Sequence, residues 1–363
     1  MLDRIQLREI DWVLIGLSLA NALIGLLLIF SASHLSPAQP ALKQAVWLLI
    51  SLAVFFLILA FDYKLLMILA PYALGLLIVV LALLLALGRS RSGARSWIGL
   101  AFLGGQPSEF VKIFLLLVMA RIFAEYRRVY VGLGAFALSA AVVLPPVILV
   151  AMQPDMGTAM SLMPIWLGCL ALAGLNRRTL VFLLAAAILL GVIGWGFLLK
   201  DYQKERLQIV FNPSLDPRGA GYHVLQSKIA IGSGGWLGKG FLRGSQSQLR
   251  FLPARHTDFV FSVLGEEFGF VGVAVVMGLY FAMLMRIFRA VGKTRDRAGL
   301  YIVFLVGCMI SIPFLVNVFM IIGLFPITGI PIPLLSYGGS SLLSTFIALG
   351  LVVNVKMRRF ANA

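Results

Sequence analysis

Long apolar runs recur from one end of this chain to the other, and each contains about twenty residues. A run of that length crosses the hydrocarbon core of a bilayer as a helix. In lipid only helices and closed barrels satisfy the backbone hydrogen-bonding groups, and these runs are continuous rather than alternating, so helices are predicted. Apolar residues make up 61% of the chain, which exceeds their share in soluble domains. The sequence therefore predicts an all-α polytopic integral membrane protein.

About ten transmembrane helices are predicted within a single transmembrane domain, residues 1–363. The predicted spans are 12–33, 42–61, 65–87, 108–123, 131–152, 156–175, 180–199, 259–288, 300–324 and 335–355. An even number of spans places both termini on the same side of the membrane. The long segment 200–258, between the seventh and eighth spans, is predicted to be extracytoplasmic. Within it, residues 222–231 have the pattern of a short amphipathic helix in the plane of the interface.

The charge of the chain is strongly basic, with 30 Lys and Arg against 14 Asp and Glu and a net charge of +16. The positive-inside rule assigns basic connections such as 286–297 and 356–359 to the cytoplasm, so both termini are predicted to be cytoplasmic. A basic excess remains in segment 200–258, on the outer face. It indicates either a solvated loop beside anionic lipid or a surface that binds an anion. A phosphorylated lipid is the expected partner there, and nucleic acid is not.

The polar stretch 244–258 ends on one carboxylate, Asp258, at the start of the eighth span. Three basic or titratable residues precede it: Arg250, Arg255 and His256. A lone acid flanked by cations at a membrane surface is suited to an anionic substrate. The alternative is a solvated loop in which Asp258 caps the next helix.

Other ionisable groups lie at the ends of predicted spans or inside them. Glu109 and Lys112 share a helix face, so they form either a structural ion pair or a phosphate site in which Glu109 orients Lys112 or holds a cation. Ser108 is a candidate N-cap for the fourth span, and Asp155 for the sixth. One of two adjacent acids in the eighth span, Glu266 and Glu267, is expected to face the bundle interior.

Asp258 is the candidate general base for a glycosyl transfer from a sugar pyrophosphate. The leaving group is good, so one base on the acceptor hydroxyl and cations on the pyrophosphate suffice. No dedicated cluster of metal ligands is evident. A divalent cation, Mg²⁺ or Mn²⁺, held by Asp258 or Glu109, is a further possibility for neutralising the pyrophosphate.

Several motifs occur in order over nearly the full length of the chain. They are Arg95-Ser-Trp97, Gln106-Pro-Ser-Glu109-x-x-Lys112, Gln153-Pro-Asp155-x-Gly157, Gly221-Tyr-His-x-x-Gln226, Gln246-x-Gln248, Leu252-Pro-x-x-His256-Thr-Asp258 and Gly338-Gly-Ser340. With these motifs the chain resembles the SEDS family (shape, elongation, division, sporulation), and its Gln-x-Gln spacing resembles the rod-elongation members. Ala254 departs from the family pattern, which often has Glu at that position.

The resemblance implies a peptidoglycan glycosyltransferase that polymerises lipid II on the outer face of the bacterial cytoplasmic membrane and releases undecaprenyl pyrophosphate. It also implies a class B penicillin-binding protein as the partner that cross-links the glycan. Asp258 is then the catalytic acid. The expected substrate-binding residues are Arg95, Trp97, Glu109, Lys112, Asp155, Gln246, Gln248, Arg255, His256 and Ser336. The alternatives are a flippase for the lipid-linked precursor and a non-catalytic scaffold for the partner.

Overall fold

The computed structural model describes residues 9–34, 36, 39–87, 105–126, 130–193, 196, 201–212, 216, 219–249, 251–252 and 254–358. Within these ranges the chain is helical, with no β-sheet. The long helices are α2 (Trp12–Ser33), α3 (Pro40–Ala60), α4 (Tyr63–Leu87), α5 (Pro107–Glu125), α6 (Leu133–Met152), α7 (Met156–Ala173), α8 (Arg177–Ile193), α12 (Val260–Val291), α13 (Arg297–Ile321) and α14 (Gly339–Met357). The all-α fold predicted from the apolar runs is therefore confirmed.

Eight of the described helices are long and apolar enough to cross a membrane: α2, α3, α4, α6, α7, α12, α13 and α14. The other two predicted spans correspond to α5, which carries four charged residues, and to α8, which has 17 residues. Most of the α5 side chains are buried, because this helix packs against α4, α7, α13 and α14. A helix enclosed by protein can carry ionisable groups that a lipid-facing helix cannot. The count of ten spans stays a prediction.

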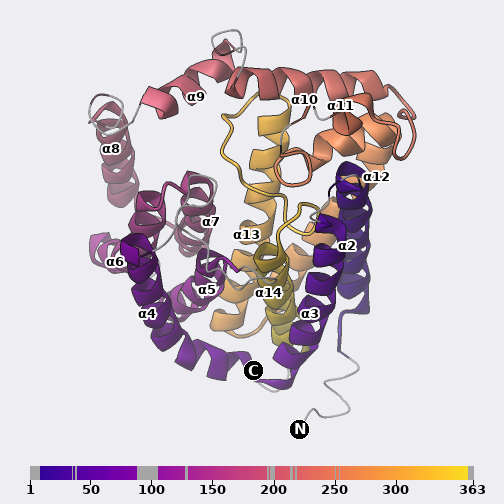
Figure 1. Cartoon of the computed structure of the whole chain (residues 1–363). Coiled ribbons are helices and arrows are strands. Elements are labelled where there is room, and N and C mark those ends of the chain that lie inside the picture. Colours follow the sequence, from indigo (N-terminus) through magenta and orange to yellow (C-terminus); the bar gives the residue numbers. More distant parts are fainter. Residues whose placement is uncertain are drawn as a thin grey trace.

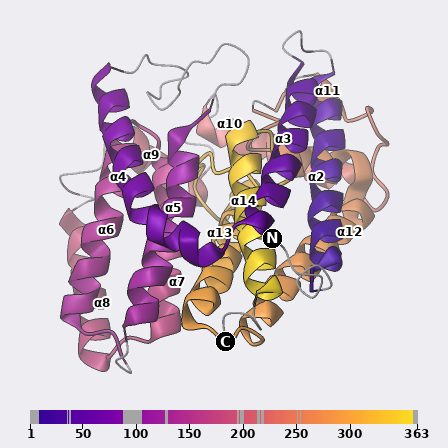
Figure 2. The same ribbon diagram turned by 90° about the horizontal axis from the view of Figure 1, so that it is seen from below.

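The bundle is arranged around α13 and α14. Figure 2 shows α4, α6 and α8 on one side of these two helices and α2, α3 and α12 on the other. Helix α13 packs against α5, α7, α12 and α14, and α14 packs along α3. Helices α5, α7 and α14 begin at the same face of the bundle, because their first turns line one cavity. Helix α12 begins there too, because Arg286 near its end and Lys356 near the end of α14 bind the same Asp11.

A charged clamp closes the opposite face. Asp11, the N-cap of α2, is buried and accepts from Arg286 of α12 at 2.9 Å and from Lys356 of α14 at 2.6 Å. Burial raises the pKa of Asp11, but the hydrogen bonds from Arg286 and Lys356 outweigh it and hold the pKa below its ordinary value. This clamp ties together the ends of three helices that are far apart in the sequence.

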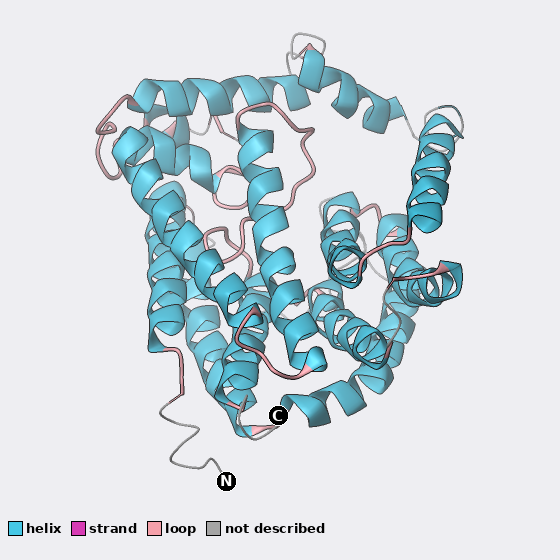
Figure 3. Ribbon diagram, turned by 180° about the vertical axis from the view of Figure 1, so that it is seen from behind, coloured by secondary structure: helices cyan, strands magenta, loops and turns pink. Residues whose placement is uncertain are grey.

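The long segment between α8 and α12 contains three shorter helices. They are α9 (Asp201–Phe211), α10 (Ala220–Gly234) and α11 (Ser245–Gln248). Figure 1 and Figure 3 show α9 and α10 following one another along one edge of the molecule. Helix α10 includes the predicted amphipathic helix 222–231 and packs against α12.

Helix α12 is broken at Gly269, whose φ is 63°, a left-handed conformation that glycine adopts without a Cβ clash. The loop after α10 pairs with the break: the N–H of Phe270 donates to Gly235 at 2.9 Å, and the N–H of Lys239 donates to Glu266 at 3.0 Å. Every residue from Phe259 to Glu267 is buried. The predicted span 259–288 therefore corresponds to α12, but pairing with a distant loop divides this helix at Gly269.

The tenth predicted span, 335–355, also starts too early, since α14 begins at Gly339. Gln44 of α3 explains the difference. Its amide nitrogen donates to the carbonyl of Ser336 at 3.3 Å, and its amide oxygen accepts from the N–H of Gly338 at 3.1 Å. The side chain thus bonds to both ends of residues 336–338 and helps to hold them in a turn before the helix.

Candidate functional site

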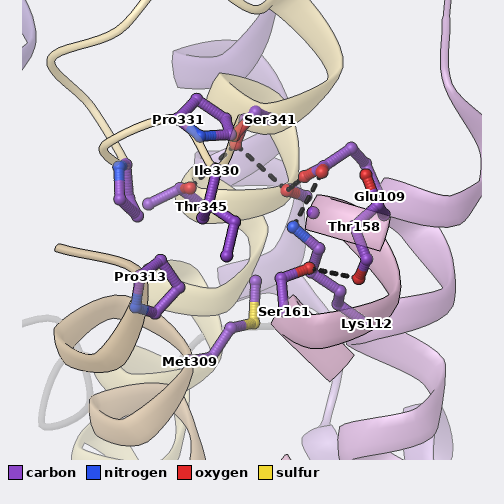
Figure 4. A pocket seen from close by; sticks show the side chains of 13 residues that line it. Glu109, Lys112, Thr158, Ser161, Met309, Pro313, Ile330, Pro331, Ser341 and Thr345 are labelled. Carbon is purple, nitrogen blue, oxygen red and sulfur yellow. Dashed lines mark hydrogen bonds and ion pairs between the residues drawn. The ribbon is translucent and has the colours of Figure 1, made fainter. Parts of the chain in front are cut away.

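A small polar cavity lies where the first turns of α5, α7 and α14 meet the segment between α13 and α14 (Figure 4). Its lining consists of Glu109 and Lys112 of α5, Gly157, Thr158 and Ser161 of α7, Met309 and Pro313 of α13, Ile330, Pro331 and Pro333 of the segment, and Ser341, Ser344 and Thr345 of α14. The first turns of three helices therefore lie beside it. A helix N-terminus carries a partial positive charge, and Lys112 adds a cation, so the cavity is suited to an anion.

The ion pair of Glu109 and Lys112 forms one wall of the cavity (Figure 4). Lys112 Nζ donates to Glu109 Oε1 at 2.7 Å, and the hydroxyl of Ser344 donates to Glu109 Oε2 at 3.1 Å. Both charged side chains are buried, at 9% and 4% exposed for Lys112 and Glu109. The predicted pairing is confirmed, and both residues of the pair line the cavity.

The start of α5 differs from the prediction. Gln106 occupies the N-cap position and Pro107 the first helical position, where proline needs no N–H partner. Ser108 lies inside the helix with its hydroxyl buried and without a partner. Ser108 is therefore not the N-cap, because the helix starts at Pro107 and its N-cap, Gln106, lies two residues before Ser108.

Asp155 caps α7, as predicted. Its Oδ1 accepts from the N–H of Thr158 at 3.1 Å, and its Oδ2 accepts from the Thr158 hydroxyl at 2.9 Å. Oδ2 also accepts from the side-chain amide of Gln106 at 2.5 Å. The same carboxylate therefore fixes the N-terminus of α7 relative to the N-terminus of α5, beside the cavity.

Asp258 lies next to the cavity wall and is half-buried. Its Oδ2 is 3.6 Å from the position that a Cβ on Gly329 would occupy, and the next residue, Ile330, lines the cavity. The N-cap position of α12 belongs to Phe259, whose side chain makes no capping hydrogen bond. Asp258 therefore lies one residue before the N-cap, and not at the N-cap position.

Two further contacts hold the stretch that leads to Asp258. The N–H of Tyr337 donates to the carbonyl of His256 at 2.9 Å, and the two rings lie 5.5 Å apart. Burial, together with the nearby Arg255 guanidinium, lowers the pKa of His256 below its ordinary value. His256 is therefore held neutral at pH 7, and it contributes an aromatic contact rather than a charge.

The Gln-x-Gln motif forms the short helix α11, which is anchored to buried acids of α12. Glu266 accepts from the N–H groups of Gln246 and Ser247 at 2.8 and 3.0 Å and from Lys239 Nζ at 2.8 Å. The side-chain amide of Gln248 donates to Glu267 at 3.4 Å. These contacts give Glu266 and Glu267 the inward orientation expected for one of them, and they assign both acids to the anchoring of this loop.

Arg255 donates from Nη1 to the carbonyl oxygen of Ser247 at the end of α11. This contact joins the Gln-x-Gln motif to the residues just before Asp258. Ser336 is buried, and its hydroxyl accepts from the N–H of Ile332 at 2.9 Å, so it stabilises the loop beside the cavity. Arg95, Trp97 and Arg250 lie outside the described residues.

Sequence reasoning missed two buried amides that hold the site together, Gln44 and Asn317. Asn317 of α13 donates to the carbonyl oxygens of Asp258 and Ile330 at 3.0 and 2.7 Å. A signal was present in the sequence, because a lone amide inside an apolar span needs an internal partner.

A divalent cation finds few protein ligands here. In the part of the chain that the structure describes, no group of three or more His, Cys, Asp or Glu side chains is placed to hold a metal ion. Glu109 is already bound to Lys112 and Ser344. The residues present do not fit a metal site made by the protein alone.

Comparisons with known proteins agree over nearly the whole chain. A family model for the cell cycle proteins FtsW, RodA and SpoVE matches residues 11–360. The peptidoglycan glycosyltransferase MrdB of Escherichia coli strain K12 is 40% identical over 293 residues, covering 80% of this chain and 78% of that protein. The peptidoglycan glycosyltransferase RodA of Treponema pallidum strain Nichols is 34% identical over 426 residues, covering 97% of this chain and 98% of that protein.

Solved structures match as well. A chain from a peptidoglycan synthase complex that coordinates polymerization and crosslinking is 37% identical, with a TM-score of 0.82 and coverage of 97% of this chain and 98% of that one. The crystal structure of the rod shape determining protein RodA from Thermus thermophilus is 31% identical, with a TM-score of 0.70 and the same coverage. The resemblance drawn from the motifs is confirmed by sequence and by fold.

Proposed function

This chain belongs to the family of FtsW, RodA and SpoVE proteins, and from this membership we propose that Asp258 is the general base of its glycosyl transfer. The protein is a peptidoglycan glycosyltransferase of the bacterial membrane, with several membrane-spanning helices. Its proposed substrate is lipid II, which it polymerises for cell elongation and rod shape. The observation that carries this proposal is the position of the Asp258 carboxylate beside the wall of an anion-suited cavity.

In the proposed reaction, the Asp258 carboxylate takes the proton of a sugar hydroxyl on the incoming lipid II. That oxygen attacks the anomeric carbon of the growing glycan from the face opposite the pyrophosphate, which gives inversion. The bond from the anomeric carbon to the pyrophosphate oxygen breaks, and undecaprenyl pyrophosphate leaves with the electron pair. Asp258 has then gained the proton that the hydroxyl lost.

The developing charge on the pyrophosphate needs fixed positive groups. Lys112 and the N-termini of α5, α7 and α14 supply them at the cavity. Arg255 is the second proposed cation, and Arg95 the third. Gln246, Gln248 and Trp97 are proposed to contact the sugars or the peptide of the substrate.

A divalent cation, if used, would be brought by the substrate. The pyrophosphate oxygens would supply most of its ligands, because Asp258 and Glu109 offer at most one carboxylate each. Its role would be to neutralise the leaving group. Titration of the rate with Mg²⁺ or Mn²⁺ after chelation tests this part separately.

The face where α5, α7, α12 and α14 begin is proposed to be extracytoplasmic, with both termini cytoplasmic. The basic residues at the opposite ends of the helices support this orientation; they include Arg286, Arg289, Lys293, Arg295, Arg297, Lys356 and Arg358. A class B penicillin-binding protein is the proposed partner. Support for it comes from the similarity to a chain of a complex that couples polymerization and crosslinking.

The test is lipid II polymerisation by the purified protein with its penicillin-binding partner. Asp258→Asn is expected to lower the rate by at least about 100-fold, with unchanged melting temperature and partner binding. The matched control is Asp216→Asn, because Asp216 lies in the same long segment and its Oδ1 accepts from the N–H of Gly219 at 2.8 Å in a local turn. Full activity of Asp258→Asn would remove this acid from the reaction.

The same preparation discriminates the two alternatives. A flippase would move labelled lipid II across liposomes without making glycan, and a scaffold would keep full function in Asp258→Asn. The polar residues of the cavity lie at one end of the helices rather than through the membrane depth, which favours the enzyme over the flippase.

A further inference from the structure

Asn317 is a buried amide in the last turn of α13, and it contacts two loops at once. Its Nδ2 donates to the carbonyl oxygen of Asp258 at 3.0 Å and to the carbonyl oxygen of Ile330 at 2.7 Å. The side chain is fully buried. Both hydrogens of one amide group are therefore used to join the stretch that ends in Asp258 to the segment that lines the cavity.

The orientation of the amide follows from its neighbours. Two carbonyl oxygens accept but do not donate, so only the NH₂ end of Asn317 satisfies them. Pro313, one helical turn earlier on α13, lines the cavity directly. Helix α13 thus provides a rigid element that carries both a wall of the cavity and the amide that fixes Asp258 relative to it.

We propose that Asn317 is a positioning residue for the glycosyl transfer, acting through the backbone of Asp258. This inference rests on the proposed role of Asp258 as general base. Asn317 holds the carbonyl of Asp258 and the carbonyl of Ile330 at one shared point, so it sets the distance from the carboxylate to the cavity that contains Lys112. Asn317 itself contacts neither substrate nor leaving group in this assignment.

Loss of the amide removes that shared point and lets the two loops separate. A displacement of the base by about 1 Å lowers a rate by up to about 100-fold. The binding of lipid II depends on other groups, so KM should change little. The expected signature is a fall in kcat with nearly constant KM, which indicates a loss confined to the transition state.

The experiment compares Asn317→Ala and Asn317→Asp with Asn354→Ala in the purified protein with its partner. Asn354 is a close match, because its Nδ2 also donates to two backbone carbonyls, Ile58 and Phe61, at 2.7 and 2.6 Å, and it is fully buried. It lies in the last turns of α14, at the opposite face from the cavity. Asn317→Asp keeps the volume of the side chain and removes both donors, so it tests the role if the alanine variant does not fold.

Polymerisation is measured with fluorescent lipid II, per molecule of protein that elutes as a monodisperse complex. The Asn317 variants are expected to lose at least about tenfold in kcat, with KM within about threefold, whereas Asn354→Ala keeps at least half of the wild-type kcat. Equal kcat in Asn317→Asp and Asn354→Ala, or a change in KM alone, would overturn the inference. Asp258→Asn is measured in the same experiment. If the Asn317 inference is overturned and Asp258→Asn is active, the proposed general base is wrong as well. If Asp258→Asn is inactive, the proposed base stands and only the role of Asn317 is wrong.

Discussion

The backbone N–H of Tyr337 donates a hydrogen bond of 2.9 Å to the carbonyl oxygen of His256. This bond joins the loop before α12 to the loop before α14. Asn317 joins the same two loops through the carbonyl oxygens of Asp258 and Ile330. The candidate site is therefore built from segments that only the folded bundle brings together. Substitutions at the contacts between these segments, compared by melting temperature and by polymerisation rate, should separate effects on folding from effects on catalysis.

The ion pair of Glu109 and Lys112 can be tested by comparing single and double variants. Lys112→Met leaves the buried Glu109 carboxylate without its cation, so the variant should lose about 3 kcal/mol of stability and all polymerisation. Glu109→Gln with Lys112→Met removes both charges and should recover most of the stability. The measurement is the melting temperature in detergent, beside the rate of lipid II polymerisation.

Activity decides between the two roles of this pair. If the pair is only structural, the double variant should polymerise lipid II at close to the wild-type rate. If Lys112 binds the pyrophosphate, the double variant stays inactive although it is folded. Arg121→Met is the matched control, since Arg121 pairs with Glu125 at 3.4 Å on the exposed end of the same helix.

Gly339 at the start of α14 has no room for a side chain. A Cβ there would lie 2.1 Å from Nε1 of the Trp47 indole of α3. Gly339→Ala should therefore lose about 2 kcal/mol through overpacking and displace the loop beside the cavity. Trp47→Leu in the same chain should restore much of the melting temperature; a melting temperature of the single variant equal to that of wild type would contradict this packing.

Glu266 should act as a structural anchor for α11. Glu266→Gln removes the charge that Lys239 and two backbone N–H groups share, and it should cost about 3 kcal/mol and expose residues 239–249 to protease. Glu125→Gln provides the comparison, because Glu125 is 72% exposed in its ion pair and should cost less than about 1 kcal/mol. Equal protease resistance of Glu266→Gln and wild type would argue against the anchor.

The Asp11 clamp should give a pH-dependent contribution to stability. Its pKa is lower in the folded protein than the ordinary 3.8, so the unfolded chain binds the proton first as pH falls. The contribution is complete above about pH 5 and disappears as pH falls through the folded pKa. Asp11→Asn should lose about 2 kcal/mol at pH 7, and the difference between its melting temperature and that of wild type should shrink as pH falls below the ordinary pKa of 3.8. A constant difference between the two proteins across this range would be evidence against the clamp.

The helices were predictable because the backbone hydrogen-bonding groups of a segment in lipid must be satisfied within the protein, and a helix does so. The prediction 12–33 coincides with α2, and Asp155 was correctly expected to cap α7. The positions that were missed depend on contacts between distant segments. Nothing near Gly269 signals a break, because the loop at residues 235–240 produces it. Asp258 could be selected from its charge and its motif, but its proximity to Gly329 required the fold.

The break at Gly269 has a consequence for how the protein sits in different bilayers. An unbroken helix of 32 residues would be about 48 Å long, much more than the hydrocarbon core of about 30 Å. Residues after Gly269 alone suffice to cross that core. Hydrophobic mismatch therefore concerns the residues after Gly269, whereas the turns from Val260 to Glu267, which follow Asp258, are buried inside the protein.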